Sequence, residues 1–254
     1  MLSTEIIPCL QDNYSYIIYD SVSDTVGVVD PSEFEPIDQI ISKKYKKINY
    51  ILNTHHHFDH VGGNLELKEK YNAKIVCSEL DKNRIPGSEI ILKSDDEFKF
   101  GSIIFKIIFV PGHTSGHIIF YSKEENTAFT GDTLFSLGCG KIFEGTYDQM
   151  FASLNKIRNL NKRTKIYCGH EYTKSNFDFC YRYDNENKDL IKKLKFIEER
   201  INKKLPTIPV TLEEELKTNI FLRCNNTYVK GKLKMPRASE ELIFKKLRDL
   251  KDKF

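Results

Sequence analysis

NTHHHFDHVGG (residues 53–63) holds four of the chain's seven histidines together with one aspartate. Its spacing, His-x-His-x-Asp-His, makes candidate ligands of His55, His57, Asp59 and His60. Neutral imidazole and carboxylate are donors that suit zinc, iron or manganese. The alternative is a histidine-rich turn that binds metal only adventitiously, and the positions of the other histidines weigh against it.

The other three histidines lie in two segments, VPGHTSGH (residues 110–117) and YCGHEYT (residues 167–173). Each histidine- or aspartate-rich segment follows a short apolar run: YILN before His55, IIFV before His113, TAFT before Asp132 and KIYC before His170. Strand ends in layered α/β proteins converge along one edge of a sheet, where sites are usually built. We therefore expect these segments to meet in space.

The number of candidate ligands indicates more than one metal ion. A structural zinc site is normally closed by four ligands, often cysteines, whereas this chain offers seven candidates and no obvious cysteine. That supply fits two ions that share a bridge and keep positions open for water. We expect His56, which lies between ligand positions, and His117, which opens a strand, to have structural roles.

Composition places the chain among ordinary globular proteins. Its 254 residues are 40% apolar and 30% charged, enough for one large domain or one domain with a smaller appendage. A net charge of +3 does not argue for a nucleic-acid partner, and KKYKK (residues 43–47) is read as the solvated end of a helix.

Cysteine usage and hydropathy indicate the compartment. The six cysteines are scattered without a Cys-x-x-Cys pair, which is typical of reduced thiols in the cytosol. The N-terminus lacks the pattern of a signal peptide, and no apolar run approaches the eighteen or so residues of a membrane helix. We expect a soluble cytoplasmic protein with no membrane partner, as a monomer or weak homo-oligomer.

Strand-like and helical patterns alternate through the first two-thirds of the chain, which indicates an α/β layered domain over residues 1–173. Helices are expected at 33–45, 64–71 and 147–160, and strands at 14–20, 24–30, 48–54, 73–78, 102–110, 117–122, 126–132 and 164–170.

Helical periodicity dominates the rest, so we expect a second, helical domain over residues 174–254. NENKDLIKKLKFIEERINKKL (residues 185–205) has this periodicity, PTIPVT interrupts it, and LEEELKTN (residues 212–219) resumes it. The tail SEELIFKKLRDLKDKF (residues 239–254) places Ile243, Leu247, Leu250 and Phe254 on one stripe.

The motifs HHHFDH, GHTSGH, TGDTLF and GHEYT, in this order, resemble the metallo-β-lactamase superfamily. A closer resemblance is to the glyoxalase II (hydroxyacylglutathione hydrolase) family. It rests on DTLFSLGCGKIFEGT (residues 132–146), CGHEYT, LKFIEE and LPTIPVTLEEELKTNIFLR (residues 205–223). The resemblance implies a metallo-β-lactamase-like layered αββα domain followed by a smaller C-terminal helical domain.

The resemblance also implies a metal assignment. His55, His57 and His113 would hold one divalent ion, and Asp59, His60 and His170 would hold the second. Asp132 would bridge the two ions, which are expected to be zinc, with iron or manganese as alternatives. Asp59 and Asp132 would in addition orient the attacking hydroxide and so count as catalytic.

Five residues would bind substrate by the same resemblance: Lys141, Phe143, Tyr172, Arg248 and Lys251. Phe143 occupies a place where the family commonly has tyrosine, so one hydroxyl contact to glutathione is expected to be missing. By sequence alone, Arg248 and Lys251 would be a solvated helix end, and as an exposed pair their effect on KM should shrink at high salt. Lys230 or Lys234 would contribute if the register before the last helix differs.

The activity implied is hydrolysis of the thioester S-D-lactoylglutathione, and of related 2-hydroxyacyl glutathione thioesters, to glutathione and D-lactate in methylglyoxal detoxification. A thiolate, whose parent pKa is about 8.5, leaves without a strong general acid, so a thioester is favoured over an amide. The alternatives are a mono-iron persulfide dioxygenase acting on glutathione persulfide and a metal-binding, non-enzymatic module on the same fold. A larger thiol could also replace glutathione.

Overall fold

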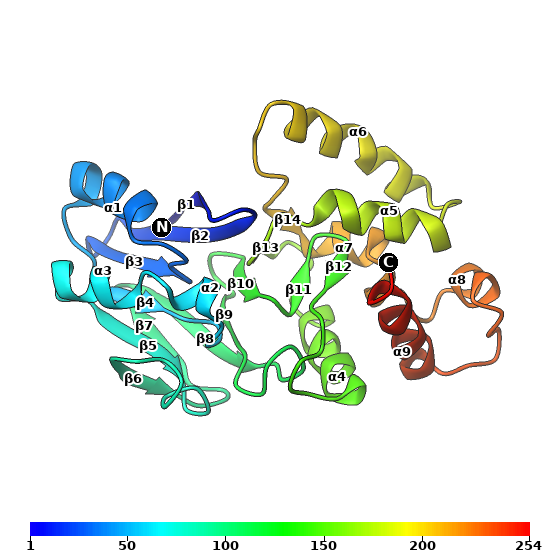
Figure 1. Ribbon diagram of the computed structural model, residues 1–254, viewed down its shortest axis with the longest axis horizontal. Helices are drawn as coiled ribbons and strands as arrows, with labels where there is room; N and C mark the ends of the chain where they lie inside the picture. The colour runs from blue at the N-terminus through cyan, green and yellow to red at the C-terminus, as the bar shows by residue number, and fades with distance from the viewer. The chain divides into compact units, whose positions relative to one another are not determined.

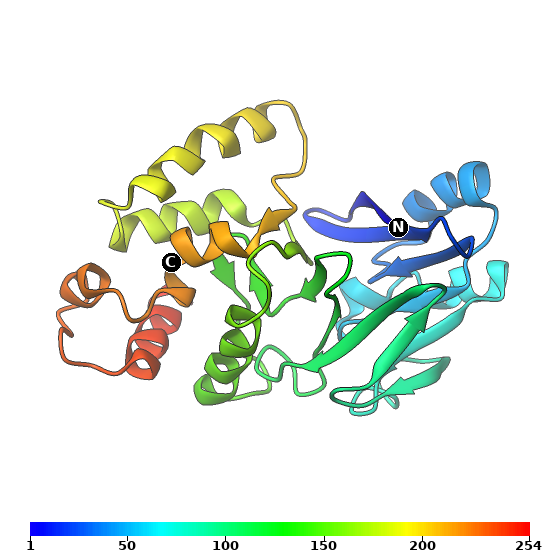
Figure 2. The same cartoon turned by 180° about the vertical axis from the view of Figure 1, so that it is seen from behind.

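The computed structural model describes residues 1–254, and the chain divides into two compact units. The first comprises Met1–Phe109 with Ser115–Gly131, and the second comprises Val110–Thr114 with Asp132–Phe254. Figure 1 and Figure 2 show the chain from opposite sides. No helix combines the length and the apolar content that crossing a bilayer requires. The boundary at residues 173 and 174 stays a prediction from the helical periodicity of the sequence after it.

The first unit contains a mixed six-stranded sheet in the order β1 to β6. Strands β1 to β3 are antiparallel neighbours, whereas β3 to β6 run parallel. The carboxyl ends of β3, β4 and β5 therefore lie along one edge of this sheet. The strands are β1 (Leu2–Cys9), β2 (Asn13–Asp20), β3 (Thr25–Val29), β4 (Tyr50–Leu52), β5 (Lys74–Ser78) and β6 (Ser88–Leu92).

Helices cover one face of this sheet. Buried side chains of the α1 segment (Glu35–Ile40, continued by a π-helical turn over Ile41–Tyr45) and of α3 (Asn64–Tyr71) pack against alternate residues of the strands. Ile37, Ile41 and Leu67 are fully buried in this cluster. The helix expected over residues 33–45 is thus present, and its last turn is wound as a π-helix.

A second, antiparallel sheet lies against the other face of the first. Its strands β7 (Glu97–Phe100), β8 (Ile103–Phe109), β9 (Ile118–Ser122) and β10 (Thr127–Gly131) follow one another as a meander. Aromatic rings join the two sheets: Tyr16 lies 5.4 Å from Phe129, and Tyr50 lies 5.2 Å from Phe98. A Cβ atom at Gly27 would come within 2.7 Å of the Phe100 ring, so only glycine allows this approach.

The second unit is mainly helical. Figure 2 shows its helices α5 and α6 side by side, and a small hairpin and a short antiparallel strand pair accompany the helices. The elements are β11 (Leu134–Phe135), β12 (Gly138–Cys139), α4 (Tyr147–Arg158), β13 (Lys165–Cys168), α5 (Thr173–Tyr183), α6 (Lys188–Asn202), β14 (Val210–Thr211), α7 (Leu212–Thr218), a 3-10 turn (Ile220–Leu222), α8 (Thr227–Lys232) and α9 (Glu240–Lys251).

Side-chain caps determine where these helices begin. Thr146 and Gln149 form a capping box at the start of α4, and Thr211 and Glu214 form another at the start of α7. The side chain of Ser239 accepts a hydrogen bond from the backbone of Leu242 at the start of α9. The expected stripe of α9 is buried at Ile243 and Leu247, while Phe254 lies beyond the helix and is half exposed.

Candidate metal centre

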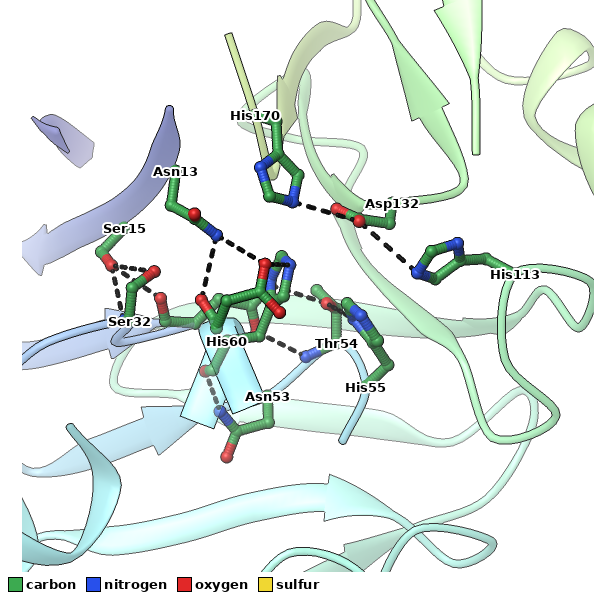
Figure 3. A network of polar contacts seen from close by, with 12 residues as sticks. Asn13, Ser15, Ser32, Asn53, Thr54, His55, His60, His113, Asp132 and His170 are labelled. Atoms are coloured by element: carbon green, nitrogen blue, oxygen red, sulfur yellow. Dashed lines mark hydrogen bonds and ion pairs between the residues drawn. The ribbon is translucent and has the colours of Figure 1, made fainter. Parts of the chain in front are cut away.

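In the first unit, the loop after β4 and the short helix α2 (Phe58–Val61) bring three imidazoles together. The ring of His55 lies 4.7 Å from that of His57 and 4.2 Å from that of His60, centroid to centroid. His55 and His60 are buried, and His57 is partly exposed. Figure 3 shows two of these residues, His55 and His60, together with Thr54.

Asp30, at the end of β3, orients two of these rings. Its Oδ2 lies 3.1 Å from Nδ1 of His60, and the Oγ1 of Thr54 donates to the same oxygen over 2.6 Å. Because the single hydroxyl proton of Thr54 goes to Asp30, Oγ1 accepts from Nδ1 of His55, 3.0 Å away. Both histidines therefore carry their proton on Nδ1, which puts the ligand lone pair on Nε2.

Asp30, His55 and His60 offer ligand atoms within 4.8 Å of one another. We read Asp30 as an orienting residue, since both of its oxygens already accept hydrogen bonds from Thr54. Sequence reasoning did not name it as a site residue. The signal was present, because Asp30 ends a strand-like run in the same way as the candidate ligands do.

Asp59 is held by Asn13, another residue that sequence reasoning missed. The Nδ2 of Asn13 donates to the backbone oxygen of Asp59 over 3.1 Å and to its Oδ2 over 2.9 Å. This same Oδ2 lies 3.6 Å from Nε2 of His60. Asn13 begins β2, which is distant in the sequence, so no local pattern marks the contact.

The two histidines expected to be structural are turned to other partners. Nδ1 of His56 lies 3.6 Å from Oδ2 of Asp81, a fully buried carboxylate after β5. His117 is fully buried and stacks on His55 with a centroid distance of 4.7 Å and an interplanar angle of 17°. These contacts support the loop.

The second unit holds the other three candidate ligands, all buried. Figure 3 shows Asp132 between two histidines: its Oδ2 lies 3.5 Å from Nε2 of His113 and 3.2 Å from Nε2 of His170. The Nδ1 of His113 donates to the backbone oxygen of Lys141 over 2.8 Å, so Nε2 again carries the lone pair. His170 follows β13, as the sequence pattern indicated.

The spacing within each unit fits a metal ion. Two nitrogen or oxygen ligands that bind zinc at about 2.0–2.1 Å with tetrahedral angles are about 3.3 Å apart. Three ligand-atom pairs, each within one unit, measure 3.2, 3.5 and 3.6 Å. Unprotonated Nε2 atoms beside carboxylates are the donor set that zinc, iron and manganese accept. Each unit therefore holds a group of side chains able to bind metal.

Three of the candidate substrate residues lie beside the histidines of the second unit. Tyr172 stacks on His170 with a centroid distance of 4.7 Å and an interplanar angle of 3°. Phe143 is 60% exposed and meets the His113 ring edge-on at 5.3 Å. The ammonium of Lys141 lies 5.4 Å above the Phe143 ring. Phe143 thus presents an apolar surface next to a cation.

Arg248 and Lys251, on α9, differ in their surroundings. Arg248 is 4% exposed, and its Nη1 donates to the backbone oxygen of Cys139 over 2.8 Å while Nη2 donates to Asp252 over 3.0 Å. The expectation of an exposed cation pair is therefore wrong for Arg248, because its guanidinium donates to the backbone oxygens of Cys139, in β12, and of Gly140, which follows it. Burial lowers the pKa of Lys251, and the neighbouring Arg248 lowers it further.

Comparison with known proteins identifies the family. Residues 10–170 match the Metallo-beta-lactamase superfamily, and residues 171–254 match the Hydroxyacylglutathione hydrolase C-terminus. A hydroxyacylglutathione hydrolase of Pelagibacter ubique is 52% identical over 253 residues, which cover 100% of both chains. The chain belongs to the hydroxyacylglutathione hydrolase family.

A second relative supports the family, and two solved structures share the fold. A hydroxyacylglutathione hydrolase of Methylococcus capsulatus is 40% identical over 100% of this chain and 99% of its own. The crystal structure of ETHE1 from Myxococcus xanthus superposes with a TM-score of 0.69 over 98% of this chain and 91% of its own, at 20% identity. That of BLEG-1 B3 metallo-beta-lactamase gives 0.66 over 87% and 99%, also at 20% identity. The metallo-β-lactamase fold with a C-terminal helical domain, expected from the sequence, is confirmed.

Proposed function

We propose that this protein is a hydroxyacylglutathione hydrolase that cleaves S-D-lactoylglutathione and related 2-hydroxyacyl glutathione thioesters. The observation that carries the proposal is the end-to-end similarity, 52% and 40% identical, to relatives of that name. The match of residues 171–254 to the C-terminal region of the same family supports it. The products would be glutathione and a 2-hydroxy acid such as D-lactate.

The metal ligands form the first part of this proposal. His55, His57 and His113 would hold one ion, Asp59, His60 and His170 the second, and Asp132 would bridge them. The hydrogen bonds that Nδ1 makes in His55, His60 and His113 support Nε2 ligation at these positions. When bound, divalent ions lower the pKa of water and polarise a carbonyl group. We propose zinc, with iron and manganese as the alternatives.

The chain's own carboxylates and histidines indicate a good leaving group. Asp59 and Asp132 would orient the attacking water as well as bind metal. The two histidines outside the ligand set, His56 and His117, face Asp81 and the His55 ring. No residue of the proposed set is assigned to protonate a departing alkoxide or amine, so a thiolate, with a parent pKa of about 8.5, is the leaving group that suits it.

Glutathione is the proposed thiol portion of the substrate, and the residues proposed to bind it lie in the second unit. Tyr172, Phe143 and Lys141 offer stacking surface and a cation beside His170 and His113. Lys251 and Arg248 supply further positive charge on α9. Glutathione carries two carboxylates, which such cations would attract. A larger thiol is the alternative that Phe143 leaves open.

The proposed setting is the cytoplasm, with a glutathione thioester as the partner and a monomeric or weakly associating chain. All six cysteines are buried as thiols, which suits a reducing compartment. A net charge of +3 gives no reason to invoke nucleic acid, and we propose no membrane partner.

A paired assay tests the function. Purified metal-replete protein should hydrolyse S-D-lactoylglutathione and should consume no oxygen with glutathione persulfide. Matched oxygen esters and amides should react far more slowly, because their leaving groups need a proton. Oxygen uptake without thioester cleavage would favour the persulfide dioxygenase, and no turnover with either substrate would favour a metal-binding module without enzymatic activity.

A further inference from the structure

The hairpin β11–β12 separates two residues of the proposed site, Asp132 before it and Lys141 after it. Each of its strands has two residues, and Leu137 in the turn has a φ of 61°, in the left-handed region that a leucine rarely adopts. An isolated hairpin of this length is not stable in water. Other parts of the second unit must therefore hold it in shape.

Buried side chains from the helices hold the turn of this hairpin. The backbone N–H of Leu137 donates to Oε2 of Glu215 over 2.7 Å, and the hydroxyl of Ser136 lies 3.3 Å from Oε1. Asn219 donates to the backbone oxygen of Gly138 over 3.0 Å, and Asn176 donates to that of Ser136 over 3.1 Å. Glu215 thus satisfies the N–H group of the strained residue itself.

A buried cation fixes Glu215 in turn. The Nζ of Lys193, on α6, lies 2.8 Å from Oε1 of Glu215, on α7. The side chains of these two residues are 8% and 0% exposed. Asn219 also donates to Oε2 over 3.0 Å. A charge this deeply buried is retained only when it is paired and hydrogen-bonded, and both conditions are met here.

Backbone contacts link the position of the hairpin to the residues of the proposed site. The backbone N–H of Gly140 donates to Thr133, and a Cβ atom on Gly140 would lie only 1.9 Å from the backbone oxygen of Asp132. Next in the chain, the backbone oxygen of Lys141 accepts the hydrogen bond that Nδ1 of His113 donates. A shift of the hairpin would therefore displace Asp132 relative to His113.

We propose that Glu215, paired with Lys193, is a positioning residue of the site: it holds the β11–β12 hairpin so that Asp132 meets His113 and His170 at ligand distance. The inference rests on the proposed function for the roles of Asp132 and Lys141. Glu215 is fully buried and acts through the hairpin. The role of the helical region thereby extends to shaping the metal site as well as binding the thiol.

Two double variants separate positioning from stability. Lys193→Met with Glu215→Gln removes both charges and keeps an oxygen to accept from Leu137. Lys193→Met with Glu215→Leu removes both charges and the acceptor together. Replacing a buried ion pair by apolar residues of similar size is often neutral for stability, so we expect both proteins to fold. Only the variant with Glu215→Leu leaves the Leu137 N–H without the acceptor oxygen of residue 215.

The readouts are the urea midpoint, the exchange rate of the Leu137 amide hydrogen, metal retention against a competing chelator, and kcat. In the leucine variant we expect exchange and metal loss to be about tenfold faster and kcat to fall. Its urea midpoint should lie below that of the glutamine variant, because the Leu137 N–H and the Asn219 amide lose their acceptor, so metal retention and kcat are measured at urea concentrations at which both variants are fully folded. The glutamine variant should keep all four values near those of the natural protein. The proposal would be overturned if the leucine variant exchanged its Leu137 amide hydrogen and retained its metal at the same rates as the natural protein.

A matched control and a second variant complete the test. Glu213→Gln with Lys217→Met removes an exposed pair on α7, 2.8 Å apart, and should change none of the four readouts. Should the leucine variant fail to fold, Asn219→Ala decides: the proposal requires faster Leu137 exchange and faster metal loss, and unchanged values contradict it. If the natural protein cleaves no thioester, the proposed function fails, while amide exchange and metal retention still test this inference.

Discussion

The carboxylate of Asp30 lies 3.1 Å from Nδ1 of His60, and the side chains of both residues are almost fully buried. Outer-shell carboxylates of this kind fix the tautomer and orientation of a ligating histidine. We expect Asp30→Ala to weaken metal binding roughly 10–100-fold, and Asp30→Asn to weaken it less, because an amide oxygen still accepts. Competition with a chelator measures the change.

The control for this prediction is Asp20→Asn. Asp20 is equally buried, but it accepts hydrogen bonds from Ser102 and Ser23, away from the histidines. The Asp20→Asn variant should be less stable than the natural protein and should bind metal with the same affinity. Equal metal loss in both variants would mean that Asp30 acts only on folding.

Metal stoichiometry tests the seven-ligand assignment. Metal-replete protein should contain about two ions per chain, because one carboxylate can bridge two centres. Asp132→Ala should lose both metal and turnover, whereas His56→Ala should keep most of its metal, since His56 faces Asp81. Elemental analysis decides, and full activity with a single ion would refute the binuclear assignment.

Phe143 offers a gain-of-contact test. Its ring is 60% exposed beside His113 and Lys141. Phe143→Tyr should lower KM for S-D-lactoylglutathione about two- to tenfold, since a net hydrogen bond contributes about 0.5–1.5 kcal/mol, and should leave kcat nearly unchanged. Phe143→Leu, which removes the ring, should raise KM. An increase in KM with tyrosine would show that this position does not face glutathione.

Arg248 and Lys251 should respond differently to substitution. Arg248→Ala leaves the backbone oxygen of Cys139 without its donor and should cost roughly 1–3 kcal/mol of folding stability, seen as a lower urea midpoint. Lys251→Ala should raise KM about tenfold and leave kcat unchanged, as expected for a contact made equally in ground and transition states. Unchanged KM for Lys251→Ala would direct the search to Lys230 or Lys234.

The lowered pKa of Lys251 predicts a pH dependence of binding. Burial and the charge of Arg248 disfavour the ammonium form, so Lys251 loses its proton at a lower pH than an exposed lysine does. KM for a carboxylate-bearing substrate should therefore begin to rise at a pH below the ordinary lysine value, and this rise should be absent in Lys251→Ala. A KM profile identical in both proteins contradicts a role for Lys251 in charge recognition.

The features predicted correctly from the sequence are those marked by short motifs. The ligand motifs stand in order after apolar runs, and the structure places those segments at strand ends, with His170 after β13 and His55 after β4. The resemblance to a known family supplied the fold class. The ligand segments and the family resemblance are both recognised from short motifs, whose residues lie within a few positions of one another.

Contacts that only folding creates were not predictable. Asn13 reaches Asp59, and Asp30 reaches His60, across long stretches of chain with no shared motif. Arg248 was expected in solvent because a cation in the last turn of a helix usually lies there. Helix α5 was not named either, since TKSNFDFCYRY is rich in aromatic residues of modest helix propensity.

The hydrogen bond from His113 to Lys141 is made to a backbone oxygen, and this has an evolutionary consequence. Any residue at position 141 carries that oxygen, so the side chain there can be exchanged without loosening the histidine. Substitutions at position 141 could therefore change which acidic thiol is bound, while the proposed metal ligand His113 keeps its orientation. Insertions between Asp132 and Lys141 have no such freedom, because they would move the oxygen itself.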